Sequence, residues 1–151
     1  MSKNVFVIAE QRDGKIMKVS YELVGKAREL ADDLGQDVVA VLMGSGVEAV
    51  AGDLAKAGAD KVIVVDDPML AEYVTEPYAK AVTAVIKAND PEIVIFGASS
   101  IGRDLAPRVS ARIHTGLTAD CTKLEIDPET KLLNMTRPAF GGNIMATILC
   151  A

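Results

Sequence analysis

One glycine-rich turn has the composition of an anion-binding loop. It spans residues 97–102 (GASSIG), and Arg103 follows it. Glycines let the backbone approach a ligand closely, and the N-terminus of a following helix offers free N–H groups to an anion, to which Arg103 would add charge. The spacing matches neither a P-loop nor a dinucleotide-binding fingerprint. Two interpretations remain, a phosphate-binding turn or a tight strand-to-helix turn that binds nothing, and the pattern favours the second.

A second segment combines a charge, an aromatic ring and glycines. Residues 136–143 (TRPAFGGN) bring Arg137, Phe140 and Gly141 into one loop. An arginine can stabilise a negatively charged flavin or phosphate, an aromatic side chain can pack on a ring, and glycines permit close approach. An ordinary hairpin loop explains the same residues equally well, so the residues alone leave both alternatives open.

The other candidate residues have simpler explanations. His114 follows a predicted helix, where the helix dipole favours a cation, so a capping role is preferred. Asp66 and Asp67 precede a proline and are interpreted as a solvated turn rather than as a cation site. Cys121 and Cys150 lie far apart in strand-like segments, which favours small buried side chains over a disulfide, metal or redox role. We expect no catalytic and no metal-binding residues, because no nucleophile–base pair or ligand cluster is recognisable.

The bulk composition indicates one folded domain with an aliphatic core. The chain has 151 residues, of which 50% are hydrophobic and 25% charged, a balance that favours folding over disorder. A net charge of −5 argues against a nucleic-acid partner. The N-terminus lacks the pattern of a signal peptide, and no apolar run reaches the roughly 18 residues that a membrane span needs. We therefore expect a cytoplasmic protein without direct membrane insertion.

Strand and helix patterns alternate through the first part of the chain. Short apolar runs, typical of strands buried on both faces, occur at residues 5–9, 38–43, 61–65 and 92–96. Apolar residues at helical spacing predict a helix after each run. Ser20 is the predicted N-cap of the first helix and Gly35 its end, and Ser45 with Glu48 forms the predicted capping box of the second.

The last part of the chain predicts strands only. Leu105, Val109 and Ile113 predict a helix after the glycine-rich turn, and Pro107 implies that this helix starts near Asp104 or bends there. Beyond Thr118, strands are expected at residues 120–126, 132–137 and 144–149. This order indicates a three-layer α/β fold with a mostly parallel, Rossmann-like sheet and a strand-rich C-terminal extension. Ligands of such sheets bind beyond the carboxyl ends of the strands, which is where residues 97–102 lie.

Several long motifs resemble the N-terminal domain, domain I, of electron-transfer flavoprotein α subunits. They are residues 97–108 (GASSIGRDLAPR), 115–121 (TGLTADC) and 137–147 (RPAFGGNIMAT), and the opening strand ending in Ala9 and Glu10 is similar as well. The form of the 137–147 segment is most similar to the FixB-like, electron-bifurcating branch. The resemblance covers essentially the whole chain and implies a fold related to adenine-nucleotide hydrolases.

This resemblance implies an electron carrier rather than a classical enzyme. Family α subunits pair with a β subunit of related fold, and the heterodimer uses FAD to pass electrons between dehydrogenases, such as acyl-CoA dehydrogenases, and an acceptor. In bifurcating members a second FAD in the β subunit takes a hydride from NADH, with ferredoxin or flavodoxin as a further partner. By resemblance, Arg137 is the group expected to approach this flavin, and Phe140 and Gly141 are further cofactor-binding candidates.

Family α subunits also contain a C-terminal FAD-binding domain, whose segments are not found in residues 1–151. We therefore expect the N-terminal domain alone, as a fragment or as one piece of a split chain, which docks the β subunit and frames a flavin. Such a domain should expose an apolar patch on the strand-rich part after Thr118. The alternative is a stand-alone adenine-nucleotide-binding domain of the universal-stress type, in which residues 97–102 would hold phosphate. A self-contained enzyme ranks last.

Overall fold

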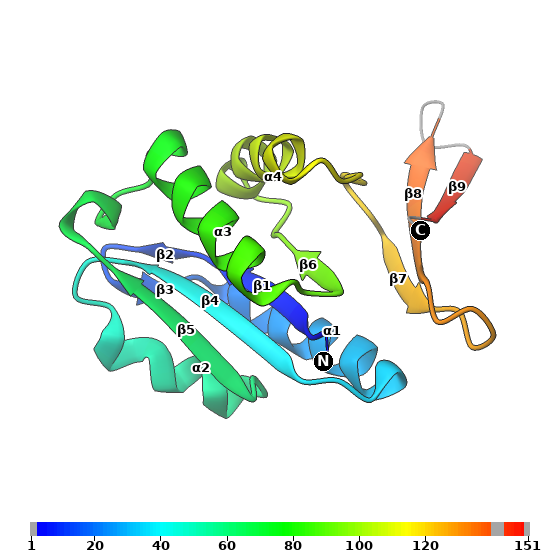
Figure 1. Ribbon diagram of the computed structural model, residues 1–151, viewed down its shortest axis with the longest axis horizontal. Coiled ribbons are helices and arrows are strands. Elements are labelled where there is room, and N and C mark those ends of the chain that lie inside the picture. Colours follow the sequence, from blue (N-terminus) through cyan, green and yellow to red (C-terminus); the bar gives the residue numbers. More distant parts are fainter. Residues whose placement is uncertain (1–2, 140–143, 150–151) are drawn as a thin grey trace.

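The computed structural model describes residues 3–139 and 144–149, with a parallel four-stranded sheet at the centre of the fold (Figure 1). Its strands are β1 (Val5–Ala9), β4 (Val38–Gly44), β5 (Lys61–Asp66) and β6 (Ile93–Ile95). Their order across the sheet is β5-β4-β1-β6, so β1 has β4 on one side and β6 on the other. The predicted α/β fold with a parallel sheet is confirmed.

Two helical layers cover the two faces of this sheet. One face carries α1 (Lys18–Leu34), the 3-10 helix η1 (Glu48–Val50) and α2 (Ala51–Ala57). The other carries the 3-10 helix η2 (Pro68–Leu70), α3 (Thr75–Asn89) and α4 (Ser100–Ile113). Alternate residues of a strand point to opposite faces. In β1, Val5 and Val7 therefore pack toward α1, whereas Phe6 and Ile8 pack toward α3 and α4.

A small hairpin joins β1 to α1, and it changes the expected start of that helix. The hairpin consists of β2 (Gln11–Arg12) and β3 (Lys15–Ile16). Helix α1 then begins at Lys18 with Met17 as its N-cap, so the prediction of Ser20 as N-cap is wrong. The Ser20 hydroxyl is buried and binds the backbone of Glu10 instead. Gly35 ends the helix as predicted, in the left-handed conformation with a φ of 66°.

Helix α4 begins at the glycine-rich turn and contains Pro107 in its interior. Its first residue is Ser100, which excludes the first of the two alternatives, a start near Asp104. Because proline has no N–H, the helix lacks one backbone hydrogen bond at Pro107. The side chain of Ser99 caps the N-terminus of the helix by accepting the N–H of Gly102. The helix therefore brings its N-terminus to the carboxyl edge of the parallel sheet.

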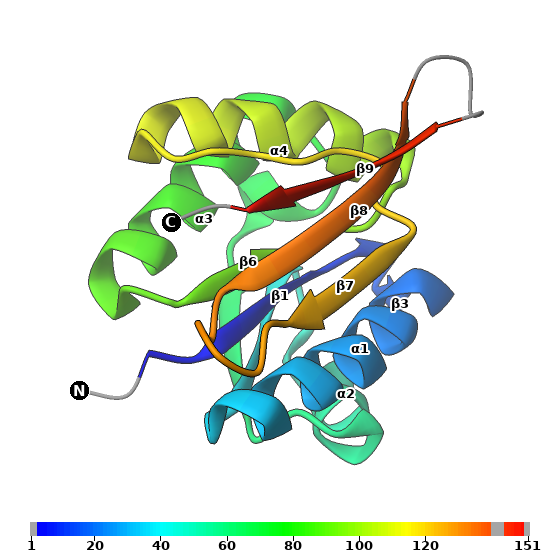
Figure 2. The same cartoon turned by 90° about the vertical axis from the view of Figure 1, so that its right-hand side faces the viewer.

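The chain beyond α4 forms a separate antiparallel sheet, as predicted. Strands β7 (Lys123–Ile126), β8 (Leu133–Ala139) and β9 (Ile144–Leu149) pair in the order β7-β8-β9. The three-stranded sheet packs on α1 through Leu124, Ile126 and Leu133. Figures 1 and 2 show it at one end of the molecule, beyond the β6 edge of the parallel sheet. Strand β9 is its outer strand, since no strand of the described residues pairs with its far side.

One ion pair ties the starts of β4 and β5 to α1. Asp60 accepts from the backbone N–H of Val38 at 2.8 Å and from Arg28 Nη1 at 2.6 Å. Arg28 Nη2 also donates to the carbonyl oxygen of Gln36 at 3.2 Å. The Val38 N–H and, next, the Arg28 side chain lower the pKa of Asp60 below its ordinary value. The stabilisation from this carboxylate is therefore present above the ordinary pKa and is lost as the pH falls through the lowered one.

Replacing Asp60 by Asn should lower the free energy of unfolding at neutral pH by about 1 kcal/mol, because a charge-assisted hydrogen bond and an ion pair are lost. The difference from the wild type should shrink once the pH falls below the ordinary Asp pKa of 3.8. Urea unfolding on either side of that pH measures both values, with Asp33→Asn on the exposed side of α1 as the control. A difference that stays constant with pH would contradict the role given to Asp60.

Candidate functional site

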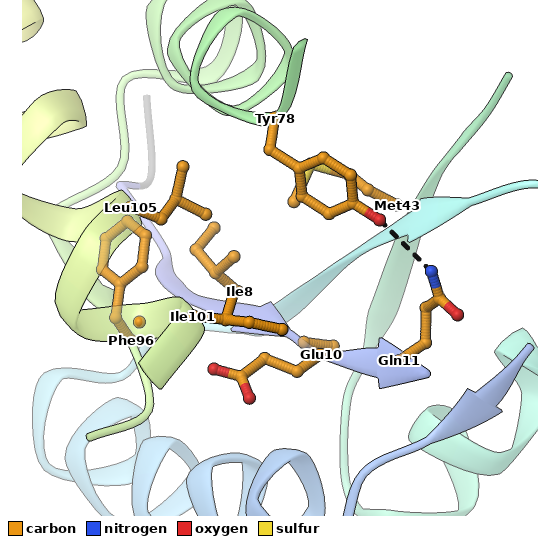
Figure 3. Close-up of a pocket in the computed structure, with 10 residues that line it drawn as sticks. Ile8, Glu10, Gln11, Met43, Tyr78, Phe96, Ile101 and Leu105 are labelled. Carbon is orange, nitrogen blue, oxygen red and sulfur yellow. Dashed lines mark hydrogen bonds between the residues drawn. The ribbon is translucent and has the colours of Figure 1, made fainter. Parts of the chain in front are cut away.

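The strand order reverses at β1, which has β4 on one side and β6 on the other, and a crevice lies at the carboxyl ends of β1 and β6. Open parallel sheets bind ligands at this position. Here the free space is about 10 Å³, which is room for about one water molecule. Figure 3 shows side chains from β1, β4, α3 and α4 converging on it. The lining residues are Ile8, Ala9, Glu10, Gln11, Met43, Tyr78, Phe96, Ile101, Gly102 and Leu105.

The glycine-rich turn is closed by its own backbone. A Cβ atom on Gly102 would lie 1.8 Å from the carbonyl oxygen of Gly97, so only glycine fits at position 102. The N–H of Gly102 donates to the Ser99 hydroxyl at 3.0 Å. Arg103, expected to add charge to the turn, reaches Asp120 instead, with its Nη2 at 3.0 Å from the carboxylate. The glycines therefore serve a tight strand-to-helix turn, which is the interpretation that the pattern favours.

Glu10 fills the turn from the side of β1. The residue is only 8% exposed, and its Oε1 accepts a hydrogen bond from the Ser99 hydroxyl. The same oxygen lies 3.2 Å from a Cβ position built on Gly97 and 3.5 Å from one built on Gly102. The carboxylate therefore lies between the two glycines at the N-terminus of α4, where the helix dipole favours negative charge.

Sequence reasoning names Glu10 only as part of a family motif. The available signal was a single carboxylate directly after the apolar run Val5–Ala9, at the ligand-binding edge of a parallel sheet. The backbone of Glu10 is held from both sides: its N–H donates to Ser20 Oγ at 2.7 Å, and its carbonyl accepts from the N–H of Met17 at 2.9 Å. These bonds hold the end of β1 against the start of α1.

Two backbone N–H groups at this edge are bound by a carboxylate. Asp66, at the end of β5, accepts from the N–H groups of Gly46 and Val47 at 2.9 and 3.0 Å. The predicted capping box of Ser45 and Glu48 is wrong, because η1 has no side-chain cap within the described part of the chain. The carboxylate that binds these N–H groups comes from a neighbouring strand.

Gln11 and Tyr78 close the crevice on the side of β4 and α3. Gln11 Nε2 donates to the Tyr78 hydroxyl oxygen at 3.2 Å (Figure 3), and this hydroxyl donates to the carbonyl of Leu70 at 2.5 Å. Burial raises the pKa of Tyr78, and the hydrogen bond from Gln11 opposes this in part. Tyr78 is therefore a neutral donor that serves the fold.

Arg137 lies on β8, opposite Ala146 of β9, and is half-buried. It shares a face of the three-stranded sheet with Met135, because alternate strand residues point to the same side. Burial raises the pKa of the Cys121 thiol, and the Arg137 charge opposes this shift. Arg137 therefore places a positive charge near Cys121.

The partners proposed for Arg137 in its loop, Phe140 and Gly141, lie outside the described residues, as does Cys150. The glycine-rich turn leads into α4, whereas Arg137 belongs to the three-stranded sheet. One link between them runs through Asp120, which pairs with Arg103 and precedes Cys121. The cofactor-binding group expected around Arg137 stays a prediction.

The remaining candidates have local roles. His114 is the C-cap of α4, with a φ of 56°, and its N–H donates to the carbonyl of Ser110. Asp67 caps η2 by accepting the N–H of Met69 at 2.8 Å. Within residues 3–139 and 144–149, no group of three or more His, Cys, Asp or Glu side chains is placed to hold a metal ion. No described helix is both long and apolar enough to cross a membrane.

Comparison with known proteins defines the class. Residues 5–151 match the electron transfer flavoprotein domain family. The electron transfer flavoprotein subunit alpha of Thermoanaerobacterium thermosaccharolyticum is 56% identical over 148 residues, covering 98% of this chain and 44% of that protein. Protein FixB of Clostridium saccharobutylicum is 51% identical, with the same coverage. The chain belongs to the electron transfer flavoprotein family.

A further relative carries a more specific name. The lactate dehydrogenase (NAD(+),ferredoxin) subunit LctC of Acetobacterium woodii is 48% identical over 147 residues, covering 97% of this chain and 35% of that protein. The chain spans less than half the length of these relatives. The predicted similarity to α subunits and FixB proteins is confirmed.

Substituting Gly102 by Ala tests the closure of the turn. The new methyl group would overlap the Gly97 carbonyl, so the free energy of unfolding should fall by about 1–3 kcal/mol or more. Gly25→Ala is the matched control, because Gly25 lies in α1 with open space around its Cβ position. This control should be neutral or more stable by about 1 kcal/mol. Equal urea unfolding curves for the two variants would contradict the geometry.

Proposed function

We propose that residues 1–151 form domain I of an electron-transfer flavoprotein α subunit. The domain docks a β subunit of related fold and frames a flavin. The heterodimer passes electrons between dehydrogenases and an acceptor through FAD. Family membership supports the electron-transfer role, and the exposed apolar surface of the three-stranded sheet is the observation that carries the docking role.

Large apolar side chains are exposed on and beside this sheet. Met145 and Ile148 of β9 are 53% and 37% exposed, and Leu117 in the preceding segment is 45% exposed. Met145 pairs across from Pro138 and Ile148 from Met135, so the two lie on opposite faces of β9. The apolar surface therefore surrounds the outer edge of the sheet, in the part of the chain where the sequence predicts it.

The outer edge of β9 also offers backbone hydrogen bonds. Its far side has no neighbouring strand among the described residues, and an unpaired edge binds an extended segment of another chain readily. We infer that a strand of the β subunit adds to β9 while its apolar side chains cover Met145 and Ile148. Docking would then remove both the open edge and the exposed apolar area from water.

Met145→Glu should weaken binding of the β subunit at least tenfold, since burying a methionine side chain contributes about 1.5–3 kcal/mol. Met69→Glu is the control, because Met69 is 69% exposed but lies in η2, before α3. Titration of labelled β subunit measures both affinities. Equal affinities for the two variants, or no complex with the wild-type chain, would contradict the docking surface.

The crevice at the carboxyl ends of β1 and β6 does not enclose a flavin. Its free space is about 10 Å³, so FAD does not fit there. Arg137 can instead contribute to one wall of a site that another subunit completes. FAD, when bound, supplies the electron-transfer chemistry, and the Arg137 guanidinium favours a negatively charged form of the flavin. Phe140 and Gly141 belong to the same proposal as further contacts to the cofactor.

In the heterodimer, Arg137→Ala should lower the reduction potential of the β-side flavin by about 20–60 mV. This range corresponds to the loss of about 1–3 kcal/mol in a two-electron couple. Arg137→Lys should recover part of the shift. Lys123→Ala serves as the control, because it removes a positive charge from the same sheet, where Lys123 is already paired with Glu125. Spectroelectrochemical titration gives the potentials, and an unchanged potential with Arg137→Ala would refute the assignment.

The bifurcating branch is the finer part of this proposal. A relative named for NAD(+) and ferredoxin supports NADH as donor to the β-side flavin and ferredoxin or flavodoxin as one acceptor. In this scheme acyl-CoA or other dehydrogenases are further partners, in a cytoplasmic setting. The adenine-nucleotide-binding alternative has less support, because the N–H groups of Gly46, Val47 and Gly102 are all occupied by the chain's own oxygens.

A further inference from the structure

Glu10 is a buried carboxylate without a basic partner. The residue is 8% exposed, and none of the ion pairs among residues 3–139 and 144–149 includes it. A buried carboxylate is unfavourable unless neighbouring groups replace the water that it loses. The packing of β1 does not require a charge, since Val5–Ala9 is entirely apolar. The carboxylate therefore has to be explained by what it contacts.

The carboxylate accepts one hydrogen bond, from a hydroxyl at the start of α4. Oε1 accepts from the Ser99 hydroxyl, which itself accepts the N–H of Gly102, and it lies between Gly97 and Gly102. The N-terminus of the fourteen-residue helix α4 adds a favourable field. This arrangement of glycine turn, capping hydroxyl and helix N-terminus is the one that holds phosphates in nucleotide-binding α/β folds.

We propose that the Glu10 carboxylate is an internal substitute for a ligand phosphate: it occupies the anion position of this fold and excludes nucleotide phosphates from the crevice. Ser20 is the positioning residue, because its hydroxyl binds both the N–H and the carbonyl of Glu10 and fixes the direction in which the side chain leaves β1. The inference concerns the chain itself and is independent of the proposed docking to a β subunit.

Removing the carboxylate should convert this position into a site for small oxyanions. Glu10→Ala should melt at a lower temperature than the wild type in dilute buffer. Sodium formate or inorganic phosphate should then raise its Tm by about 2 °C or more beyond their effect on the wild type, because an anion that binds only the folded state stabilises it. Sodium chloride at equal ionic strength should not reproduce the gain.

Two further variants identify the cause. Glu22→Ala removes a carboxylate from the exposed side of α1 and should respond to formate and phosphate as the wild type does. Glu10→Gln removes the charge but keeps the volume, so it should show no oxyanion-specific gain. The proposal is overturned if Glu10→Ala gains no more than the wild type, or if Glu10→Gln gains as much as Glu10→Ala.

If Glu10→Ala is unfolded in dilute buffer, the yield of refolded protein replaces the Tm. Recovery with formate or phosphate but not with chloride supports the proposal, and equal failure in all three salts contradicts it. Titration of the folded variant and the wild type with AMP adds a readout for nucleotides. Binding of AMP by the variant alone supports the exclusion of nucleotides by Glu10, whereas binding of AMP by the wild type overturns it.

Discussion

The contact on which the candidate site depends is the Glu10 carboxylate inside the glycine turn that begins α4. Burying this charge costs several kcal/mol unless it is compensated, and the Ser99 hydroxyl and the helix N-terminus are the groups that compensate it. The contact also accounts in part for Gly97, because a side chain there would press on Val19 and on the carboxylate, whereas Gly102 is needed because a side chain would overlap the Gly97 carbonyl. It also explains why Ser20 is buried at a helix start, where it holds the backbone of Glu10.

A crevice with only about 10 Å³ of free space moves the proposed functional surface elsewhere. The parallel sheet and its helices form a self-contained core, whereas the three-stranded sheet leaves an open edge and exposed apolar side chains at one end of the molecule (Figure 1). Under the proposed function, this division leaves the α/β core as the support of the antiparallel sheet. In the same proposal, the antiparallel sheet is the part that meets the partner and the flavin, and Arg137 is its half-buried cationic residue.

The sequence predicted the parts of the fold that depend on local pattern. The four apolar runs became the four parallel strands, and Gly35 ended its helix, because burial on both faces and a left-handed cap leave clear local signals. The caps at Ser20 and Ser45 were predicted wrongly: Ser20 binds the backbone of Glu10 across the β2–β3 hairpin, and η1 has no side-chain cap in the described part of the chain. Helix α4 begins at Ser100, directly in the glycine turn, and continues through Pro107, which the local pattern did not indicate. Glu10 as a site residue could not be predicted from pattern, since its significance arises only when Ser99 is brought to it across 89 positions. The roles of Phe140 and Gly141 stay predictions.

Hydrogen–deuterium exchange of the chain, alone and with the β subunit, tests most directly that this domain binds through its antiparallel sheet and not through its crevice. We predict that the β subunit slows exchange in β8 and β9, and that exchange at residues 97–103 stays as slow in the free chain as in the complex, because that turn is already closed by Glu10. Slowed exchange confined to the glycine turn, or no change anywhere in β8 and β9, would contradict this account.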